Sequence, residues 1–198
     1  NSISQEVIFP RWEEYLPHQQ QVLRDHHRFK VLVWHRRARK TTTALTEIIK
    51  QALYRVGVYW YLFPTYGEAK DAVWREPEML FRILPEQVIA RTNETELVVY
   101  LKNRSVIQLK GADDPNALRG SGPVGMVFDE FAQIKEAAWS YAEPIIRAND
   151  GWAWFIGTPF GKNHLHKFYG WGQDKENREW KSWLLKASTS GIIKKEEL

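Results

Sequence analysis

Cysteine is missing from all 198 residues of the sequence. Disulfide bonds and thiolate metal sites are therefore excluded, which is typical of a protein from a reducing compartment. No apolar run approaches the roughly 20 residues that a membrane-spanning helix needs, and the N-terminal residues lack the apolar core of a signal peptide. Internal repeats and low-complexity stretches are missing as well. These absences predict a soluble, intracellular protein that does not act on a membrane.

The composition is that of an ordinary globular domain. Hydrophobic residues make up 43% of the sequence and charged residues 26%, which excludes general disorder. The length suits one well-buried domain and is too short for two of ordinary size. A net charge of +4, from 28 basic and 24 acidic residues, is compatible with an anionic partner without requiring one.

The most informative stretch covers residues 29–56, where an apolar segment, a basic turn and an amphipathic segment follow one another. Residues 29–34 predict a strand, and apolar residues then recur at helical spacing until Gly57 stops the pattern. We expect the helix to begin at Lys40, with free N–H groups and the positive end of its dipole facing an anion. Lys40 can then reach the terminal phosphates of a nucleotide, and Thr41 can ligate the accompanying magnesium.

This stretch departs from the phosphate-loop (P-loop) pattern G-x-x-x-x-G-K-[ST], because Trp34 and Arg39 stand at its two glycine positions. Taken alone, the stretch is better explained as a buried strand and a core helix joined by a solvated basic loop. The second glycine position is expected to need a positive φ, which costs a non-glycine residue roughly 1–2 kcal/mol. We therefore expect a loop that is strained or shifted without nucleotide, and weak ATP binding by the monomer.

The remaining pattern predicts an α/β domain. Residues 57–63 read as a second strand, so strand, helix and strand form a βαβ unit with a parallel strand pair and a right-handed crossover. Three alternating segments predict a small antiparallel extension of the sheet. Their ranges are 88–92, 97–101 and 106–110; further strands are expected at 124–128, 152–156 and 180–185, and helices from Pro17 and over 68–75, 78–84, 133–148 and 162–169.

Two adjacent carboxylates, Asp129 and Glu130, end the apolar strand predicted at 124–128. A buried strand end normally avoids adjacent charge. In a nucleotide hydrolase Asp129 would hold the magnesium shell, while Glu130 would orient and deprotonate the attacking water. Alternatively, the pair begins the following helix, whose dipole favours acids. The presence of Lys40 and Thr41 upstream favours the hydrolase.

Two other polar positions fit a nucleotide site. Thr158 follows the strand at 152–156 in the turn Gly157-Thr158-Pro159, where it can sense a γ-phosphate and pass that state to a moving part. Gln19 belongs to a glutamine-bearing turn before the first strand, which can hydrogen-bond the edges of an adenine. The spacing alone favours a surface helix rich in glutamine.

With these pieces in order, the sequence resembles the ATPase domain of the large terminase subunit of tailed bacteriophages over nearly its whole length. The resemblance implies a P-loop NTPase of the additional-strand (ASCE, RecA-like) type, with a mostly parallel central sheet flanked by helices and catalytic groups at the carboxyl ends of the strands. The matching segments are His35-Arg36-Arg37-Ala38-Arg39-Lys40-Thr41, Pro64-Thr65-Tyr66, Leu118-Arg119-Gly120, Val127-Phe128-Asp129-Glu130 and Gly157-Thr158-Pro159.

The resemblance also implies roles by position. Arg36 would contact phosphate or signal its state, and Arg119 would be an arginine finger that reaches the ATP of a neighbouring subunit; the alternative for Arg119 is a turn arginine without a partner. The implied catalytic set is Glu130, Lys40, Arg119 and Arg36, and the implied metal ligands are Thr41 and Asp129. The implied nucleotide-binding set is Gln19, Arg36, Arg37, Ala38, Arg39, Lys40, Thr41, Thr42, Asp129 and Thr158.

The function implied by the resemblance is a motor that hydrolyses ATP with Mg2+ and drives double-stranded DNA into an empty procapsid. Its implied partners are the portal protein, the procapsid, the small terminase subunit and further copies of itself, in a ring expected to be a pentamer on the portal and a monomer in isolation. The place of action would be the host cell cytoplasm, transiently at the portal. We expect residues 1–187 to form the ATPase domain and 188–198 to begin a linker to a nuclease domain that is absent from this chain.

Two other functions fit the same sequence. A helicase-like ATPase dependent on nucleic acid would share the fold. A DNA-binding or scaffold domain with an impaired P-loop would explain Arg39, but it gives no reason to keep Lys40, Thr41, Asp129 and Glu130.

Overall fold

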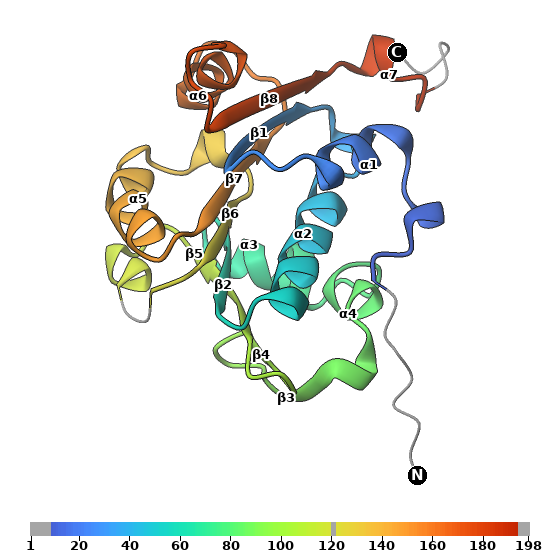
Figure 1. Cartoon of the computed structure of the whole chain (residues 1–198), viewed down its shortest axis with the longest axis vertical. Coiled ribbons are helices and arrows are strands. Elements are labelled where there is room, and N and C mark those ends of the chain that lie inside the picture. Colours follow the sequence, from blue (N-terminus) through green and yellow to red (C-terminus); the bar gives the residue numbers. More distant parts are fainter. Residues whose placement is uncertain (1–8, 120–121, 194–198) are drawn as a thin grey trace.

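One mixed sheet runs through the molecule (Figure 1), and the computed structural model describes residues 9–119 and 122–193. In these residues eight strands are arranged in the order β3-β4-β5-β2-β6-β7-β1-β8. All neighbouring pairs from β5 to β8 are parallel, whereas β3, β4 and β5 are joined antiparallel. The predicted fold class, a mostly parallel sheet with a small antiparallel extension, is confirmed. The strands are β1 Phe29–Trp34, β2 Val58–Phe63, β3 Ile89–Asn93, β4 Val98–Leu101, β5 Val106–Gly111, β6 Gly125–Phe128, β7 Trp152–Gly157 and β8 Trp180–Leu185.

Helices cover both faces of the sheet, with α5 on one side and α1 and α2 on the other (Figure 1). Successive strand residues point to opposite faces, so Leu32 of β1 belongs to the core under α2 while Val31 and Val33 belong to the core under α5 and α6. The α-helices are α1 Pro17–Arg24, α2 Lys40–Tyr54, α3 Tyr66–Ala69, α4 Leu80–Ile83, α5 Ala137–Ala148, α6 His164–Gln173 and α7 Ala187–Ser190. Short 3-10 segments lie at Trp12–Glu14, Arg36–Ala38, Glu86–Val88, Pro115–Leu118 and Phe131–Gln133, and a π turn at Lys70–Trp74.

The strand pair expected from the first βαβ unit is wrong in one respect. β1 and β2 do run parallel in the same sheet, but β6 and β7 lie between them, and β1 pairs with β7 and β8 instead. Both strands are buried on both faces, as their apolar runs predict. Which strand each one neighbours is decided by pairing with distant segments, since Phe29 of β1 pairs with Ala153 and Trp180, and Tyr59 of β2 pairs with Gly125. The result places β7 between β1 and β6, which is the additional-strand arrangement.

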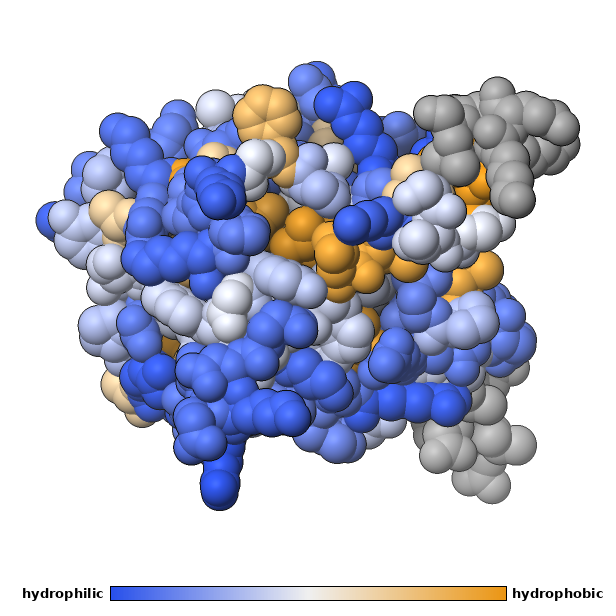
Figure 2. All heavy atoms as spheres, turned by 90° about the horizontal axis from the view of Figure 1, so that it is seen from above, coloured by the Kyte–Doolittle hydropathy of each residue, from blue (hydrophilic) through white to orange (hydrophobic). Residues whose placement is uncertain are grey.

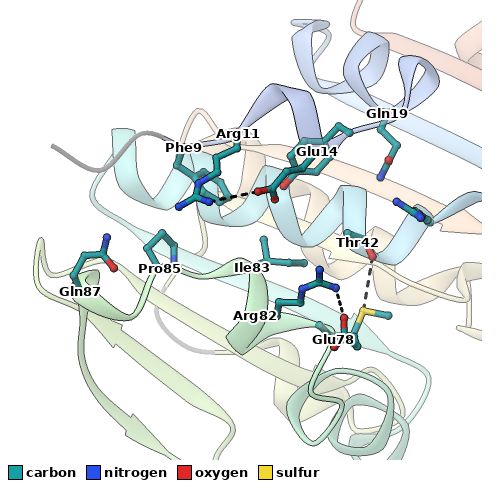
Figure 3. A pocket seen from close by; sticks show the side chains of 13 residues that line it. Phe9, Arg11, Glu14, Gln19, Thr42, Glu78, Arg82, Ile83, Pro85 and Gln87 are labelled. Atoms are coloured by element: carbon teal, nitrogen blue, oxygen red, sulfur yellow. Dashed lines mark hydrogen bonds and ion pairs between the residues drawn. The ribbon is translucent and has the colours of Figure 1, made fainter. Parts of the chain in front are cut away.

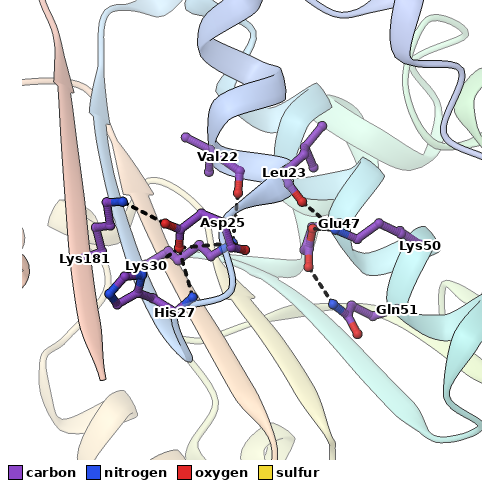
Figure 4. A network of polar contacts seen from close by, with 9 residues as sticks. All are labelled: Val22, Leu23, Asp25, His27, Lys30, Glu47, Lys50, Gln51 and Lys181. Carbon is purple, nitrogen blue, oxygen red and sulfur yellow. Dashed lines mark hydrogen bonds and ion pairs between the residues drawn. The ribbon is translucent and has the colours of Figure 1, made fainter. Parts of the chain in front are cut away.

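Buried polar contacts fix α1 against α2 and β1 (Figure 4). The Lys30 side chain is 2% exposed and donates hydrogen bonds to the carbonyls of Val22, at 2.8 Å, and Asp25. Lys50 of α2 donates to the carbonyl of Leu23 at 2.7 Å. The last carbonyls of a helix have no partner within the helix, so these two lysines stabilise the end of α1 and hold it beside α2.

The surface seen from above Figure 1 is mostly hydrophilic, with a band of hydrophobic side chains near its centre (Figure 2). One exposed hydrophobic residue is Leu184 of the edge strand β8, which is 43% exposed and lines a small cavity of about 300 Å3 with Phe160 and Leu165. Across the described part of the chain, every helix is too short or too polar to span a bilayer.

Candidate functional site

In the loop between β1 and α2, Arg39 stands where the P-loop pattern has its second glycine, and it adopts the positive φ expected there. Arg39 has φ 59° and ψ 36°, in the left-handed region, and α2 begins at the next residue, Lys40. Ala38 is fully buried, and its carbonyl lies 3.0 Å from Nε2 of His18 on α1. Arg36 and Arg39 are exposed. The predicted positive φ is thus present, and the loop keeps it although an L-residue there is strained.

The N-terminus of α2 meets the end of β6. Thr41 Oγ1 donates a hydrogen bond of 2.8 Å to Oδ2 of Asp129, 88 positions away in the sequence. Lys40 is 5% exposed, and burial lowers its pKa while Asp129 and Glu130 act in the opposite direction. The two residues implied as metal ligands therefore lie side by side, with a buried lysine next to them.

Asp129 is 1% exposed, and its carboxylate accepts three hydrogen bonds. Besides Thr41, the hydroxyl of Tyr61 on β2 donates to Oδ2 at 2.6 Å, and the backbone N–H of Glu130 donates to Oδ1 at 2.8 Å. Burial raises the pKa of Asp129 to about 6, against these hydrogen bonds, and raises that of Tyr61 well above its usual range. Sequence reasoning missed Tyr61, because a tyrosine inside an apolar strand looks like any core residue.

Glu130 also has a left-handed backbone, with φ 49° and ψ 43°. Its carbonyl accepts from the N–H of Gln133 at 2.8 Å, and the next carbonyl, that of Phe131, lies 2.6 Å from Nε2 of His164 on α6. Helix α5 begins only at Ala137. The two acids therefore do not begin that helix directly, and the predicted helix start at residue 133 is four residues early because a 3-10 turn intervenes.

Thr158 directly follows β7, the strand between β1 and β6. Its hydroxyl is buried and has no hydrogen-bond partner among the described residues. A buried hydroxyl without a partner is costly, and this one stands at the same edge of the sheet as Lys40 and Asp129.

Gln19 is 1% exposed, which contradicts the surface position that the glutamine-rich spacing favoured. Its Oε1 accepts from the N–H of Leu16 at 3.0 Å, and its Nε2 donates to Oγ1 of Thr43 in α2 at 2.9 Å. Gln19 therefore ties the start of α1 to the phosphate-loop helix. A contact between Gln19 and adenine stays a prediction.

A large cleft of about 1110 Å3 opens beside this helix, between the segment before α1 and helix α4 (Figure 3). Gln19, Arg39 and Thr42 are among its lining residues, and the Thr42 hydroxyl lies 3.9 Å from the sulfur of Met79. This volume is slightly above the roughly 300–1,000 Å3 that is usual for small-ligand pockets. The other lining residues are Phe9, Arg11, Glu14, Tyr15, Glu78, Arg82, Ile83, Pro85 and Gln87.

Arg119 directly follows the 3-10 segment Pro115–Leu118. Leu118 is 3% exposed and anchors the segment, while Arg119 itself is exposed. Gly120, the last residue of the Leu118-Arg119-Gly120 segment, lies outside the described residues.

In the described residues no cluster of three or more His, Asp or Glu side chains forms a metal site of protein ligands alone. A magnesium ion that keeps waters and phosphate oxygens needs only one or two protein ligands.

The sheet order and the grouping of Lys40, Thr41 and Asp129 define a P-loop NTPase fold of the additional-strand type. Residues 36–191 match the family "Terminase large subunit, T4likevirus-type, N-terminal", so the chain belongs to this family.

Curated relatives and solved structures agree with this membership. The large terminase subunits of Thermus phage G20c and Thermus virus P23-45 are each 30% identical over 179 residues, covering 79% of this chain and 37% of the relative. The chain thus spans little more than a third of their length. The large terminase ATPase domain of Thermus phage P74-26 has a TM-score of 0.72 at 26% identity, over 87% of this chain and 82% of that one. The large terminase of bacteriophage D6E in complex with ADP has a TM-score of 0.70 at 17% identity, over 92% and 48%, which is a likeness of fold.

Proposed function

We propose that this chain is the ATP-hydrolysing motor domain of a phage large terminase subunit. The observation that carries the proposal is the contact of Thr41 with Asp129, which joins the start of the phosphate-loop helix to the carboxylate after β6. Glu130 stands next to it in a constrained backbone. The relation to a phage domain named as an ATPase supports the same assignment.

The donors present suit ATP with Mg2+. The hydroxyl of Thr41 and the carboxylate of Asp129 are the hard oxygen ligands that magnesium prefers, and the N-terminus of α2 with Lys40 suits the phosphates. Bound there, the ion would neutralise charge on the phosphate oxygens. Glu130 would orient a water and accept its proton as the water oxygen bonds to the γ-phosphorus and the bond to the ADP oxygen breaks.

The other site residues surround this centre. Arg36, Arg37, Ala38, Arg39 and Thr42 belong to the loop and the first turn of the helix, where backbone and side chains would bind phosphates. The unpaired hydroxyl of Thr158 would contact the γ-phosphate. The base would enter the cleft that Gln19 lines. Arg119 would complete the site of a neighbouring subunit.

The wider assembly follows from family membership and is proposed with it. The partners would be double-stranded DNA, the portal protein, the procapsid and the small terminase subunit, with the motor as a ring, expected to be a pentamer, in the host cell cytoplasm. Residues 1–187 would be the ATPase domain and 188–198 the start of a linker toward a nuclease domain. A helicase-like ATPase remains the alternative, and strand separation by the protein would favour it.

The test is ATP hydrolysis and ATP binding measured side by side for the wild type, Lys40→Ala and Glu130→Ala. We expect both variants to lose hydrolysis by at least about 100-fold, the scale of a lost acid–base or electrostatic group. Only Lys40→Ala should also lose binding, since Glu130 acts on the water. If both variants kept wild-type hydrolysis, the proposed assignment as an ATP-hydrolysing motor domain would be wrong.

A further inference from the structure

Tyr61 stands in the middle of β2 and is fully buried. β2 pairs directly with β6, and Tyr61 lies opposite Val127, two residues before Asp129. The tyrosine hydroxyl therefore reaches the end of the neighbouring strand, where it donates a 2.6 Å hydrogen bond to Oδ2 of Asp129. A phenylalanine would fill the same space in the core, so packing alone does not explain the hydroxyl.

Three donors fix the Asp129 carboxylate. Two of them, the Thr41 hydroxyl and the Glu130 N–H, belong to the residues proposed for the metal and for catalysis. Tyr61 is the third, and it approaches from a different strand. Magnesium demands a nearly ideal octahedral arrangement of its ligands, so a carboxylate that serves it must be held in one rotamer. Groups that hydrogen-bond a ligating carboxylate commonly provide this.

We propose that Tyr61 is a positioning residue that fixes the Asp129 carboxylate for magnesium. The inference rests on the proposed function, since it concerns the same metal site. The Tyr61 hydroxyl holds Oδ2 from the side of β2, so the carboxylate keeps its orientation when the Thr41 hydroxyl turns its oxygen toward the ion. Tyr61 is fully buried, so in this role it would contact the carboxylate and neither the nucleotide nor the ion.

The same strand supplies a matched control. Tyr59 is also fully buried, and its hydroxyl donates to the carbonyls of Arg55 at 2.7 Å and Gln51 at 3.1 Å, at the far end of α2. Tyr59→Phe and Tyr61→Phe each remove one buried hydroxyl from β2. Only Tyr61→Phe removes it from the Asp129 site.

The experiment is calorimetric ATP binding by this chain over a series of Mg2+ concentrations, for the wild type and both variants. Tyr61→Phe should raise the Mg2+ concentration that half-saturates the metal-dependent binding by about 10-fold to 100-fold, the usual cost of losing such a partner. Binding of ATP without Mg2+ should stay unchanged, and Tyr59→Phe should behave as wild type.

Three outcomes separate the claims. An unchanged Mg2+ requirement in folded Tyr61→Phe overturns the role of Tyr61, and an equal rise in both variants overturns it too, since any buried hydroxyl would then do. Circular dichroism confirms folding. Should Tyr61→Phe not fold, Tyr61→Met replaces it, because its flexible side chain fills the core without a hydroxyl: a raised Mg2+ requirement supports the inference, and an unchanged requirement overturns it. Absence of any Mg2+-dependent binding in the wild type would instead contradict the proposed function.

Discussion

Arg39 and Glu130, one on each side of the site, hold left-handed backbone with φ of 59° and 49°. The left-handed conformation raises the energy of any residue that has a Cβ, and such strain persists only where the surrounding structure imposes it. Arg39 is the strained residue of the turn that precedes α2, and this turn sets the direction of the first N–H groups of the helix. At Glu130 the strained backbone turns the chain after β6, so that consecutive carboxylates take different positions. Both residues thus hold a strained backbone at a cost to stability, at the positions where the proposed function places ligand chemistry.

Arg39→Gly should therefore raise the free energy of unfolding by about 0.5–1 kcal/mol, which is the strain relieved less the entropy that glycine adds to the unfolded chain. Arg104→Gly is the matched control, because exposed Arg104 has φ 77° in a turn between β4 and β5. Denaturant titration should show a similar gain for both variants. Only Arg39→Gly should also change ATP binding, measured by calorimetry, because only Arg39 lies in the proposed phosphate loop. Loss of stability in Arg39→Gly alone would mean that the arginine side chain stabilises the loop more than its backbone strains it.

At the scale of the elements, the sequence predicts those whose pattern is local. β1, β2, β6 and β7 are buried on both faces and therefore appear as apolar runs, and α2 shows its helical period from Lys40 onward. The proximity of Thr41 and Asp129 was predictable too, because each follows a parallel strand and such strands end at the same edge of the sheet.

What the sequence could not predict depends on distant partners. The insertion of β6 and β7 between β1 and β2 is set by pairing across the sheet. Gln19 is buried where it bonds to Thr43 of α2, and Tyr61 of β2 contacts Asp129 at the end of β6. Neither contact leaves a periodic or compositional trace in the chain.

The anchoring of α1 gives a pH-dependent prediction. Burial alone would raise the pKa of Asp25, but hydrogen bonds from Lys181, at 2.8 Å, and from His27 lower it from 3.8 to about 2. The unfolded chain takes up this proton first on acidification, so the stability from the carboxylate is complete above about pH 4 and is lost as the pH falls toward 2. Asp25→Asn should therefore cost about 1–2 kcal/mol at neutral pH, allowing for screening by solvent, and less as the pH is lowered toward 3.

Urea titrations of the wild type and Asp25→Asn at several pH values measure this difference. Asp71→Asn is the control, because its carboxylate pairs with Arg75 at 3.4 Å on the open surface, where a single ion pair contributes little. If the loss of unfolding free energy in Asp25→Asn stayed constant down to pH 3, the charge of the Asp25 carboxylate would not be what stabilises the end of α1 against β8.

At the scale of the whole molecule, the proposed site of one chain holds no arginine that the structure places against Asp129, whose carboxylate accepts only from Thr41, Tyr61 and the Glu130 N–H among the described residues. Lys40 is buried at the phosphate end, and the exposed Arg119 is placed after the 3-10 segment that precedes β6. A guanidinium supplied by a neighbour would neutralise charge on the transferring phosphoryl group only after assembly. Hydrolysis should then rise more steeply than linearly with protein concentration.

Mixing two inactive variants tests whether Arg119 acts in trans. Arg119→Ala keeps its own Glu130, whereas Glu130→Ala keeps an arginine to donate. If the arginine of one subunit serves the site of the next, a mixture should hydrolyse ATP well above the mean of the separate proteins, because some Arg119→Ala sites gain a neighbour with Arg119. A mixture of Arg119→Ala with Lys40→Ala should recover activity in the same way. Activity of the mixture equal to the mean of the separate proteins at every concentration would place Arg119 in its own subunit's site. The same conclusion would follow if Arg119→Ala lost as much activity in dilute monomer as at concentrations where subunits meet.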